Sequence, residues 1–131
     1  MHVRDAMSTT VLTIGPTHTL RQAAKLMAER KVGAAVVLDP EADGPGILTE
    51  RDMLEAVAQS QDPDVELCQD HLTPDAVTAM PDWDLGRAAT AMVQGGFRHL
   101  VVCEGSDVVG VLSVRDIVRV VSGRGELAPA P

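Results

Sequence analysis

The chain has 131 residues, 45% of them hydrophobic, which is the size and composition of one ordinary domain with a self-sufficient core. Its 11 lysines and arginines are spread along the sequence against 19 acidic residues, so the formal net charge is -8. Nucleic acid polymers and anionic membrane surfaces both require a basic patch on their binding protein, and we therefore exclude both as partners.

The sequence also lacks the usual signals of export and membrane insertion. The N-terminus has no charged region followed by an apolar segment, and no apolar run approaches the length of about 18 residues that spans a bilayer. Cys68 and Cys103 do not form a CxxC or similar pattern. We therefore expect a cytoplasmic protein with free thiols and no contact with a membrane.

An internal repeat is the main feature of the sequence. Residues 46–54 read GILTERDML and residues 110–118 read GVLSVRDIV. The match continues upstream, where Asp5, Pro16, Leu20, Met27 and Val36 correspond to Asp70, Pro81, Leu85, Met92 and Val101. The chain therefore contains two copies of one unit. The boundaries that we predict are residues 3–59 for the first repeat, 60–66 for a connector, 67–122 for the second repeat and 123–131 for a flexible tail.

The elements of the first repeat can be predicted in chain order. An apolar run at residues 11–14 predicts a short strand. A helix follows, because its apolar residues have the spacing of a helical stripe: Leu20, Ala23, Ala24, Met27 and Ala28. Thr19-x-x-Gln22 is typical of a capping box at its start. Runs at residues 34–39 and 46–48 predict two strands joined by a turn, and a second helix begins near Thr49.

The second repeat gives the same series of elements. Strands are predicted at residues 76–80, 99–104 and 108–112, one helix begins after an Asp84 cap, and another begins near Ser113. Each repeat is thus β-α-β-β-α, and the fold class is α/β, of the α+β kind. Because such a unit buries too little surface alone, we expect the two repeats to pack sheet to sheet about a pseudo-twofold axis, with two clefts walled by both repeats.

The candidate chemistry lies where a strand ends and a helix begins in each repeat. A helix start offers unpaired N–H groups and a positive dipole end, which suit a phosphate. The Thr49 or Ser113 hydroxyl adds a hydrogen bond, and the carboxylate of Asp52 or Asp116 can accept hydrogen bonds from the paired hydroxyls of a ribose. The same residues are also what a helix needs for capping. Arg51 and Arg115 are not required for a cap, although each could pair with a neighbouring acid.

Three features of the sequence belong together: the repeated G-I/V-L-T/S-x-R-D pattern, Asp5-Ala6-Met7, and the segment GFRHLVV at residues 96–102. With these features the chain resembles a tandem pair of CBS (cystathionine β-synthase) domains, a Bateman module. The resemblance covers about residues 3–122. It implies a standalone regulatory module, of the kind used in energy sensing, that binds an adenine nucleotide (AMP, ADP or ATP) or S-adenosylmethionine between the two repeats. It also implies a homodimer formed through the helices.

The resemblance assigns Thr49 and Asp52 to one cleft and Ser113 and Asp116 to the other, each with its arginine, Arg51 or Arg115. Basic residues at the start of the central strand, here Arg98 and His99, are implied as phosphate contacts. The first repeat departs from the family pattern, since Gly33 and Ala34 stand at the matching positions. We therefore expect the two clefts to bind unequally. The positions implied around the adenine are Leu12, Ala35 and Thr78, with the aliphatic residues Val11, Ile47, Val77 and Val111, each of which could instead be core.

Other chemistries have weaker support. Cys68-x-x-His71 has the spacing of metal ligands, but a closed zinc site needs four converging groups, so we expect no metal. No triad order, phosphate loop or acid/base pair of carboxylates is present, so we expect no catalytic activity. Two hypotheses remain: a ligand sensor that signals to a separate, unknown protein, and a ligand-free structural or dimerisation module that acts through protein contacts.

Overall fold

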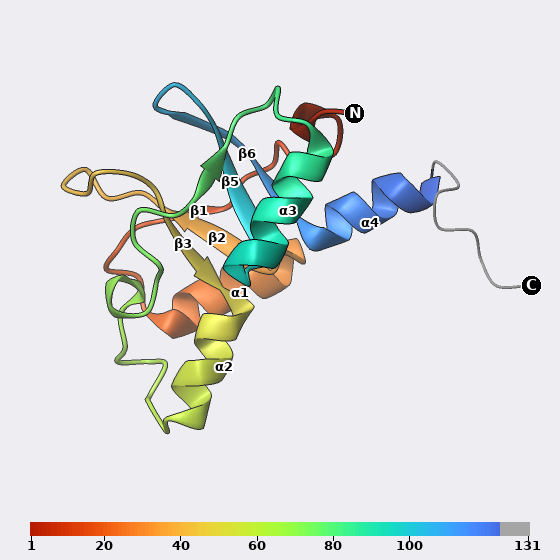
Figure 1. The fold of residues 1–131 in the computed structure, drawn as a ribbon. Coiled ribbons are helices and arrows are strands. Elements are labelled where there is room, and N and C mark those ends of the chain that lie inside the picture. Colours follow the sequence, from red (N-terminus) through yellow and green to blue (C-terminus); the bar gives the residue numbers. More distant parts are fainter. Residues whose placement is uncertain (124–131) are drawn as a thin grey trace, which may run out of the picture. The chain divides into compact units, whose positions relative to one another are not determined.

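A computed structural model describes residues 1–123, so the predicted tail, apart from Gly123, lies outside the described residues. The chain divides into two compact units (Figure 1). One unit is Val11–Ala76, and the other combines Met1–Thr10 with the residues from Val77 onward. Each unit contains one three-stranded sheet and two α-helices.

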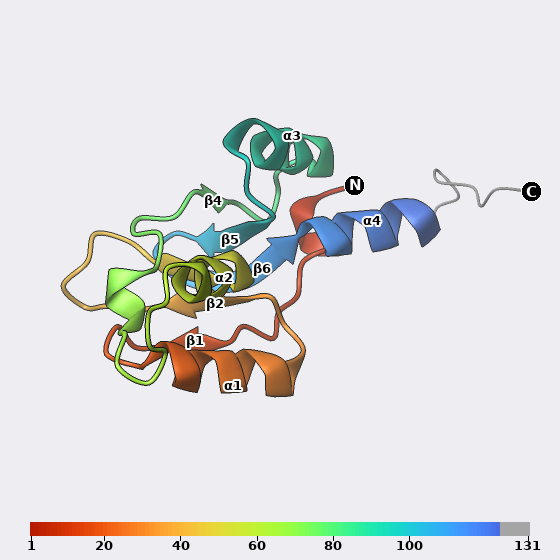
Figure 2. The ribbon, with the colours of Figure 1, turned by 90° about the horizontal axis from the view of Figure 1, so that it is seen from below.

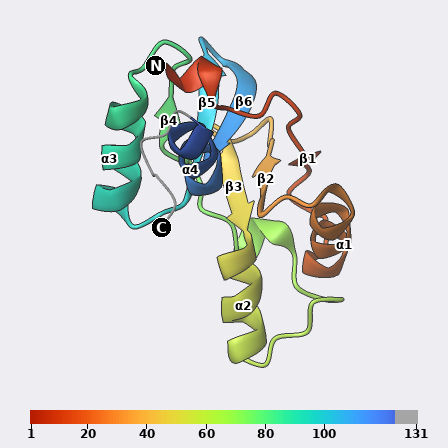
Figure 3. The same ribbon diagram turned by 90° about the vertical axis from the view of Figure 1, so that its right-hand side faces the viewer.

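The unit Val11–Ala76 has the predicted β-α-β-β-α order. Its elements are β1 (Thr13–Ile14), α1 (Leu20–Arg30), β2 (Ala34–Val37), β3 (Gly46–Thr49), α2 (Glu50–Ala58) and the 3-10 helix η2 (Cys68–Asp70). The sheet has the order β1-β2-β3, with β1 parallel and β3 antiparallel to β2. Figure 2 shows α1 running beside the β1–β2 part of the sheet, and in Figure 3 α2 continues from the end of β3.

The other unit repeats this arrangement. Its elements are the 3-10 helix η1 (Val3–Asp5), β4 (Thr78–Ala79), α3 (Leu85–Gly95), β5 (His99–Glu104), β6 (Asp107–Ser113) and α4 (Val114–Gly123). The sheet order is β4-β5-β6, with β4 parallel and β6 antiparallel to β5. Helix α4 continues directly from β6 (Figure 2). The predicted fold class and the order of the elements are therefore confirmed.

The helix caps follow from the sequence. Thr19 accepts a hydrogen bond from the Gln22 N–H at 3.1 Å, and the Gln22 side chain accepts one from the Thr19 N–H at 3.0 Å, which is the predicted capping box. Asp84 caps α3 by accepting from the Gly86 N–H at 2.8 Å. Helix α1 ends at Lys31 with φ 55°, whereas Gly96 ends α3 with φ 70°. Glycine suits this left-handed conformation and lysine does not.

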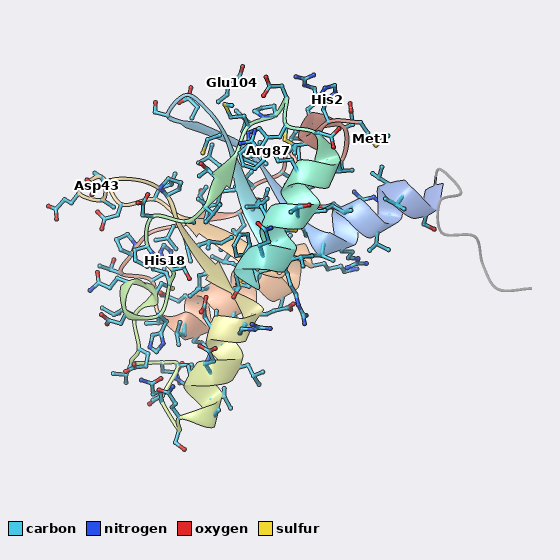
Figure 4. The ribbon with its side chains drawn as sticks, viewed as in Figure 1. Met1, His2, His18, Asp43, Arg87 and Glu104 are labelled. Atoms are coloured by element: carbon cyan, nitrogen blue, oxygen red, sulfur yellow. The ribbon has the colours of Figure 1, made fainter. Side chains whose placement is uncertain are left out.

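The segment at the start of each repeat packs in the compact unit of the other repeat. Met1–Thr10 belongs to the unit of the second repeat, where the Ser8 N–H donates to the Val111 carbonyl at 2.9 Å. Met1 and His2 lie beside the start of α3, from which Arg87 projects (Figure 4). Thr73 likewise exchanges hydrogen bonds with Ile47, at 2.9 and 3.0 Å, in the unit of the first repeat. The compact units therefore differ from the sequence repeats at both of these segments.

The core of each unit is aliphatic, as the scarcity of aromatic residues requires. The buried cluster of the first unit is Leu12, Ile14, Leu20, Ala23, Met27, Ala35, Val37, Leu48, Ala56 and Cys68. The second cluster is Val3, Ala6, Ala79, Leu85, Ala88, Met92, Leu100, Val102 and Leu112, against which Trp83 and Phe97 pack. Among residues 1–123, no helix has the length and apolar character needed to cross a membrane.

Candidate functional site

The first helix start joins β3 to α2. Thr49 ends the strand in an extended conformation and is the N-cap of the helix. Oδ2 of Asp52 accepts a hydrogen bond from the Thr49 N–H at 2.7 Å and another from the Thr49 hydroxyl at 3.2 Å. Oδ1 of Asp52 accepts no hydrogen bond from any residue in the described part of the chain. Asp52 therefore caps the helix with one oxygen and leaves the other open to a hydroxyl donor.

The second helix start joins β6 to α4, and its aspartate accepts the same backbone hydrogen bond with Oδ2. Oδ2 of Asp116 accepts from the Ser113 N–H at 2.9 Å, and the Asp116 N–H donates to the Ser113 hydroxyl oxygen at 3.0 Å. Here, however, the other oxygen has a protein donor as well, because Nη2 of Arg119 donates to Oδ1 of Asp116 at 3.0 Å. The two helix starts share their local geometry and differ in how much of the carboxylate is free.

Burial shapes the electrostatics of the first helix start. It raises the pKa of the Asp52 carboxyl above its ordinary value, and the hydrogen bonds from Thr49 oppose this rise. The negative charge of Glu55 raises the same pKa further, whereas His71 lowers it. A carboxylate that is poorly solvated in this way gains more from an added hydrogen-bond donor than an exposed one does.

The two arginines of the repeated pattern are exposed. Arg51 lies in the first turn of α2 and Arg115 in the first turn of α4. Neither forms a hydrogen bond or an ion pair with another residue of the range 1–123, so the salt-bridge interpretation that the sequence left open does not hold there. Both guanidinium groups are therefore available to an anion.

The strand register adds basic groups to one helix start. His99 begins β5 directly opposite Ser113, and the carbonyl of the exposed Arg98 accepts from the Val114 N–H at 2.9 Å. In the first repeat, Ala34 is opposite Thr49, and the Gly33 carbonyl accepts from the Glu50 N–H at 3.0 Å. The backbone arrangement is the same in both repeats, but only the second adds a guanidinium and an imidazole.

Two of the residues expected around an adenine ring are core residues. Leu12 is 5% and Ala35 is 1% exposed, and both belong to the aliphatic cluster of their unit. The Leu12 carbonyl accepts from the Val36 N–H at 2.9 Å. Thr78 is half-buried in β4, beside the 53% exposed Val77. That these residues line an adenine site stays a prediction, whereas Leu12 and Ala35 are shown to belong to the core.

The residue three positions after each aspartate was not among the predicted site residues. Arg119 and Glu55 occupy these positions and carry opposite charges. The signal was present in the sequence, because residues at i and i+3 are neighbours on a helix surface. The pairing of Trp83 with Arg87, whose guanidinium carbon lies 3.8 Å from the centre of the indole ring, was also missed.

The Cys68-x-x-His71 spacing has a structural explanation. Cys68 is fully buried in the aliphatic cluster, and burial raises the pKa of its thiol to about 11. Nε2 of His71 lies 2.8 Å from Oε1 of Glu66, which also accepts from Gln61 at 3.1 Å. Within the described residues, no three His, Cys, Asp or Glu side chains are grouped as metal ligands.

Comparison with known families decides the classification of this fold. The family model for the CBS domain matches the chain twice, at residues 3–59 and 68–123. The chain belongs to the CBS domain family. Each match contains one of the two helix starts. The repeated hydroxyl–carboxylate pair is therefore part of a duplicated CBS domain.

The curated relatives of this chain include CBS domain-containing proteins and uncharacterised proteins. A CBS domain-containing protein of Bacillus subtilis is 31% identical over 116 residues, which is 88% of this chain and 81% of the relative. An uncharacterised protein of Acidianus ambivalens is 33% identical over 118 residues, 89% of this chain and 71% of that protein. Another from Methanopyrus kandleri is 30% identical over 112 residues, and there the match covers 84% of this chain but only 57% of the longer relative.

Solved structures have the same fold. A CBS domain protein from Pyrobaculum aerophilum, complexed with AMP, is 29% identical with a TM-score of 0.84, and the match covers 99% of this chain and 100% of that chain. A CBS-domain protein from Agrobacterium tumefaciens is also 29% identical, with a TM-score of 0.83 over 92% of this chain and 98% of the other.

Proposed function

We propose that this CBS domain pair is a regulatory module that binds an adenosine-containing ligand, of the AMP, ADP, ATP or S-adenosylmethionine class, at its two helix starts. The observation that carries the proposal is the duplicated hydroxyl–carboxylate pair, in which Asp52 keeps one carboxylate oxygen free of protein partners. The similarity to a Pyrobaculum aerophilum protein complexed with AMP supports the same ligand class.

The groups at each helix start suit the parts of a nucleotide. The Asp52 and Asp116 carboxylates accept hydrogen bonds from the cis hydroxyls of the ribose. The helix N-termini, with the Thr49 and Ser113 hydroxyls, favour negative charge and receive the phosphate. Arg51 and Arg115 are exposed beside them, and Arg98 adds positive charge only at the second helix start. The ligand would thus be bound by groups that recognise its sugar and its charge, with no group acting as a catalyst.

Binding would act as a signal by favouring one conformation of the module over another. We propose that a separate protein responds to this change and that the module itself is not an enzyme. The sensed quantity would be the cellular level of adenine nucleotides or of S-adenosylmethionine. A cytoplasmic location stays a prediction from the sequence.

A second candidate function is supported by the helix surfaces. Large apolar side chains are exposed on three helices: Leu54 and Val57 on α2 at 69% and 67%, Val93 on α3 at 82%, and Val118 on α4 at 48%. Exposed apolar side chains that recur on several helices are typical of a protein interface. We propose that these helices form a homodimer, and a module that used only these contacts would be structural and need no ligand.

Isothermal titration calorimetry of the chain against AMP, ADP, ATP and S-adenosylmethionine tests the proposal. Saturable heat from at least one of them at micromolar concentration, together with a raised melting temperature, is the expected result. A chain that gives no heat with any of the four and an unchanged melting temperature is not a sensor of this ligand class. In that case, sedimentation of the Leu54→Ser and Val57→Ser variants tests the dimerisation function, which requires a shift toward the monomer.

A further inference from the structure

The position three residues after each site aspartate has opposite charges in the two repeats. Glu55 follows Asp52 on α2, and Arg119 follows Asp116 on α4. A helix brings residues i and i+3 onto neighbouring positions of its surface. The guanidinium of Arg119 uses this spacing, since its Nη2 lies 3.0 Å from Oδ1 of Asp116. Glu55 is an acceptor and cannot donate a hydrogen bond to Asp52 when ionised.

The consequence is a difference in the free acceptor capacity of the two carboxylates. Both aspartates use Oδ2 to cap their helices. Oδ1 of Asp116 is occupied by Arg119, whereas no described residue occupies Oδ1 of Asp52. A ribose hydroxyl at the second helix start would therefore have to share Oδ1 with a charged donor or displace it, while one at the first would not.

The competing contact can be displaced. The Arg119 side chain is 63% exposed and the Asp116 side chain 14%, so the guanidinium can remain solvated when it leaves. An ion pair of this exposed, local type is weak, and competition from it changes an affinity by about two-fold to five-fold. Arg119 would thus weaken the binding of a ribose hydroxyl to Asp116 without preventing it.

Resting on the proposed function, we propose that Arg119 is a specificity-determining residue, which competes with a ribose hydroxyl for Oδ1 of Asp116 and so makes discrimination between ribose and deoxyribose weaker at Asp116 than at Asp52. Recognition at the second helix start then depends more on the negative charge of the ligand, since the guanidinium groups of Arg98 and Arg115 are exposed there. Recognition at the first helix start, which has Gly33 and Ala34 beside it, depends more on the sugar.

The test compares AMP with 2′-deoxy-AMP by calorimetry. In the Asp52→Asn background, Asp116 is the remaining site aspartate, and we expect a preference for AMP about two-fold to five-fold smaller than in the Asp116→Asn background. Adding Arg119→Ala should raise the affinity for AMP by about two-fold to five-fold and leave that for 2′-deoxy-AMP unchanged. The matched control adds Arg30→Ala, which removes an exposed arginine at the end of α1 and should change neither affinity.

The reciprocal variant is Glu55→Arg, which introduces the same donor three residues after Asp52. It should lower the preference of the otherwise unmodified chain for AMP over 2′-deoxy-AMP, while the control Glu29→Arg, with the same change in charge on α1, should not. Melting temperatures of variant and control should agree, which separates the effect from a loss of folding.

The outcomes distinguish the inference from the function on which it rests. Weaker AMP binding after Arg119→Ala would make Arg119 a phosphate contact and overturn the inference, and so would an equal gain for both nucleotides. If the unmodified chain binds another of the four ligands but not AMP, the inference fails and the proposed function stands. If it binds none of the four, the proposed function fails.

Discussion

His99 lies directly opposite Ser113 in the β5–β6 register, while the matching position opposite Thr49 is held by Ala34. The two helix starts therefore have the same backbone and different side-chain surroundings. Arg98 and His99 add basic character to one of them, and a free carboxylate oxygen distinguishes the other. If the proposed function holds, we expect the phosphate to contribute more to binding at the second helix start and the ribose more at the first.

Replacing Arg98 by alanine should lower the affinity for AMP by about five-fold, because an exposed guanidinium contributes about 1 kcal/mol to a charged contact. Adenosine, which has no phosphate, should bind with unchanged affinity. Calorimetry with both ligands measures the difference. An equal loss for AMP and adenosine would show that Arg98 does not contact the phosphate, and Arg30→Ala is the control for the change in net charge.

The two repeats also contain a matched pair of helix ends. Lys31 ends α1 at φ 55° and ψ 43°, and Gly96 ends α3 at φ 70° and ψ 27°. The left-handed conformation is unfavourable by about 1 kcal/mol or more for a residue with a Cβ. Lys31→Gly should therefore raise the free energy of unfolding by about 1 kcal/mol, and Gly96→Ala should lower it by a similar amount. Denaturant unfolding of both variants checks the signs, and a destabilised Lys31→Gly variant would contradict the account.

Packing of the N-terminal segment against the second repeat can be tested at Gly110. A Cβ at this position would lie 2.7 Å from Sδ of Met7 and 2.9 Å from the backbone oxygen of Ser8. Gly110→Ala should lower the free energy of unfolding by about 1 to 3 kcal/mol. Gly123→Ala is the control, because a Cβ there would meet no atom of the described residues within 4 Å apart from its chain neighbours and the backbone of its own helix. Equal stability of the two variants would show that Met1–Thr10 is not held against this strand.

The raised pKa of Asp52 predicts how stability depends on pH. Because burial raises this pKa in the folded chain, folding favours the protonated carboxyl. The resulting stabilisation is fully present below the ordinary pKa of 3.8 and is lost as the pH rises through the raised value. Asp52→Asn keeps a neutral acceptor for the Thr49 N–H. The melting temperature of this variant minus that of the original chain should therefore increase as the pH is raised from about 3 to about 7. A constant difference over this range would contradict the assignment.

The sequence was sufficient for the order of the elements and for both helix starts. Repetition identified the units, and local chemistry identified the caps, since Thr19, Gln22 and Asp84 act through neighbours within three residues. The segment exchange could not be predicted in this way. The contacts of Ser8 with Val111 and of Thr73 with Ile47 are long-range, and no periodicity within a repeat encodes them.

The candidate site was predicted in part. Thr49, Asp52, Ser113 and Asp116 were identified by their types and spacing, and strand pairing then added the position of His99 opposite Ser113. The unequal use of the two carboxylates was not predicted. It depends on which oxygen each donor reaches, and that choice is made by side-chain conformation, as the contact of Arg119 with Oδ1 of Asp116 illustrates.

The most direct test of the central claim is the affinity of the Asp52→Asn/Asp116→Asn double variant for AMP. Both asparagines retain an oxygen that accepts the capping N–H of Thr49 or Ser113, so the melting temperature without ligand should remain close to that of the original chain. Hydrogen bonds to a charged partner contribute about 1.5 to 3 kcal/mol, so we expect the double variant to bind AMP about ten-fold to a hundred-fold more weakly. An unchanged affinity for AMP in a folded double variant would contradict the assignment of these aspartates to the ribose.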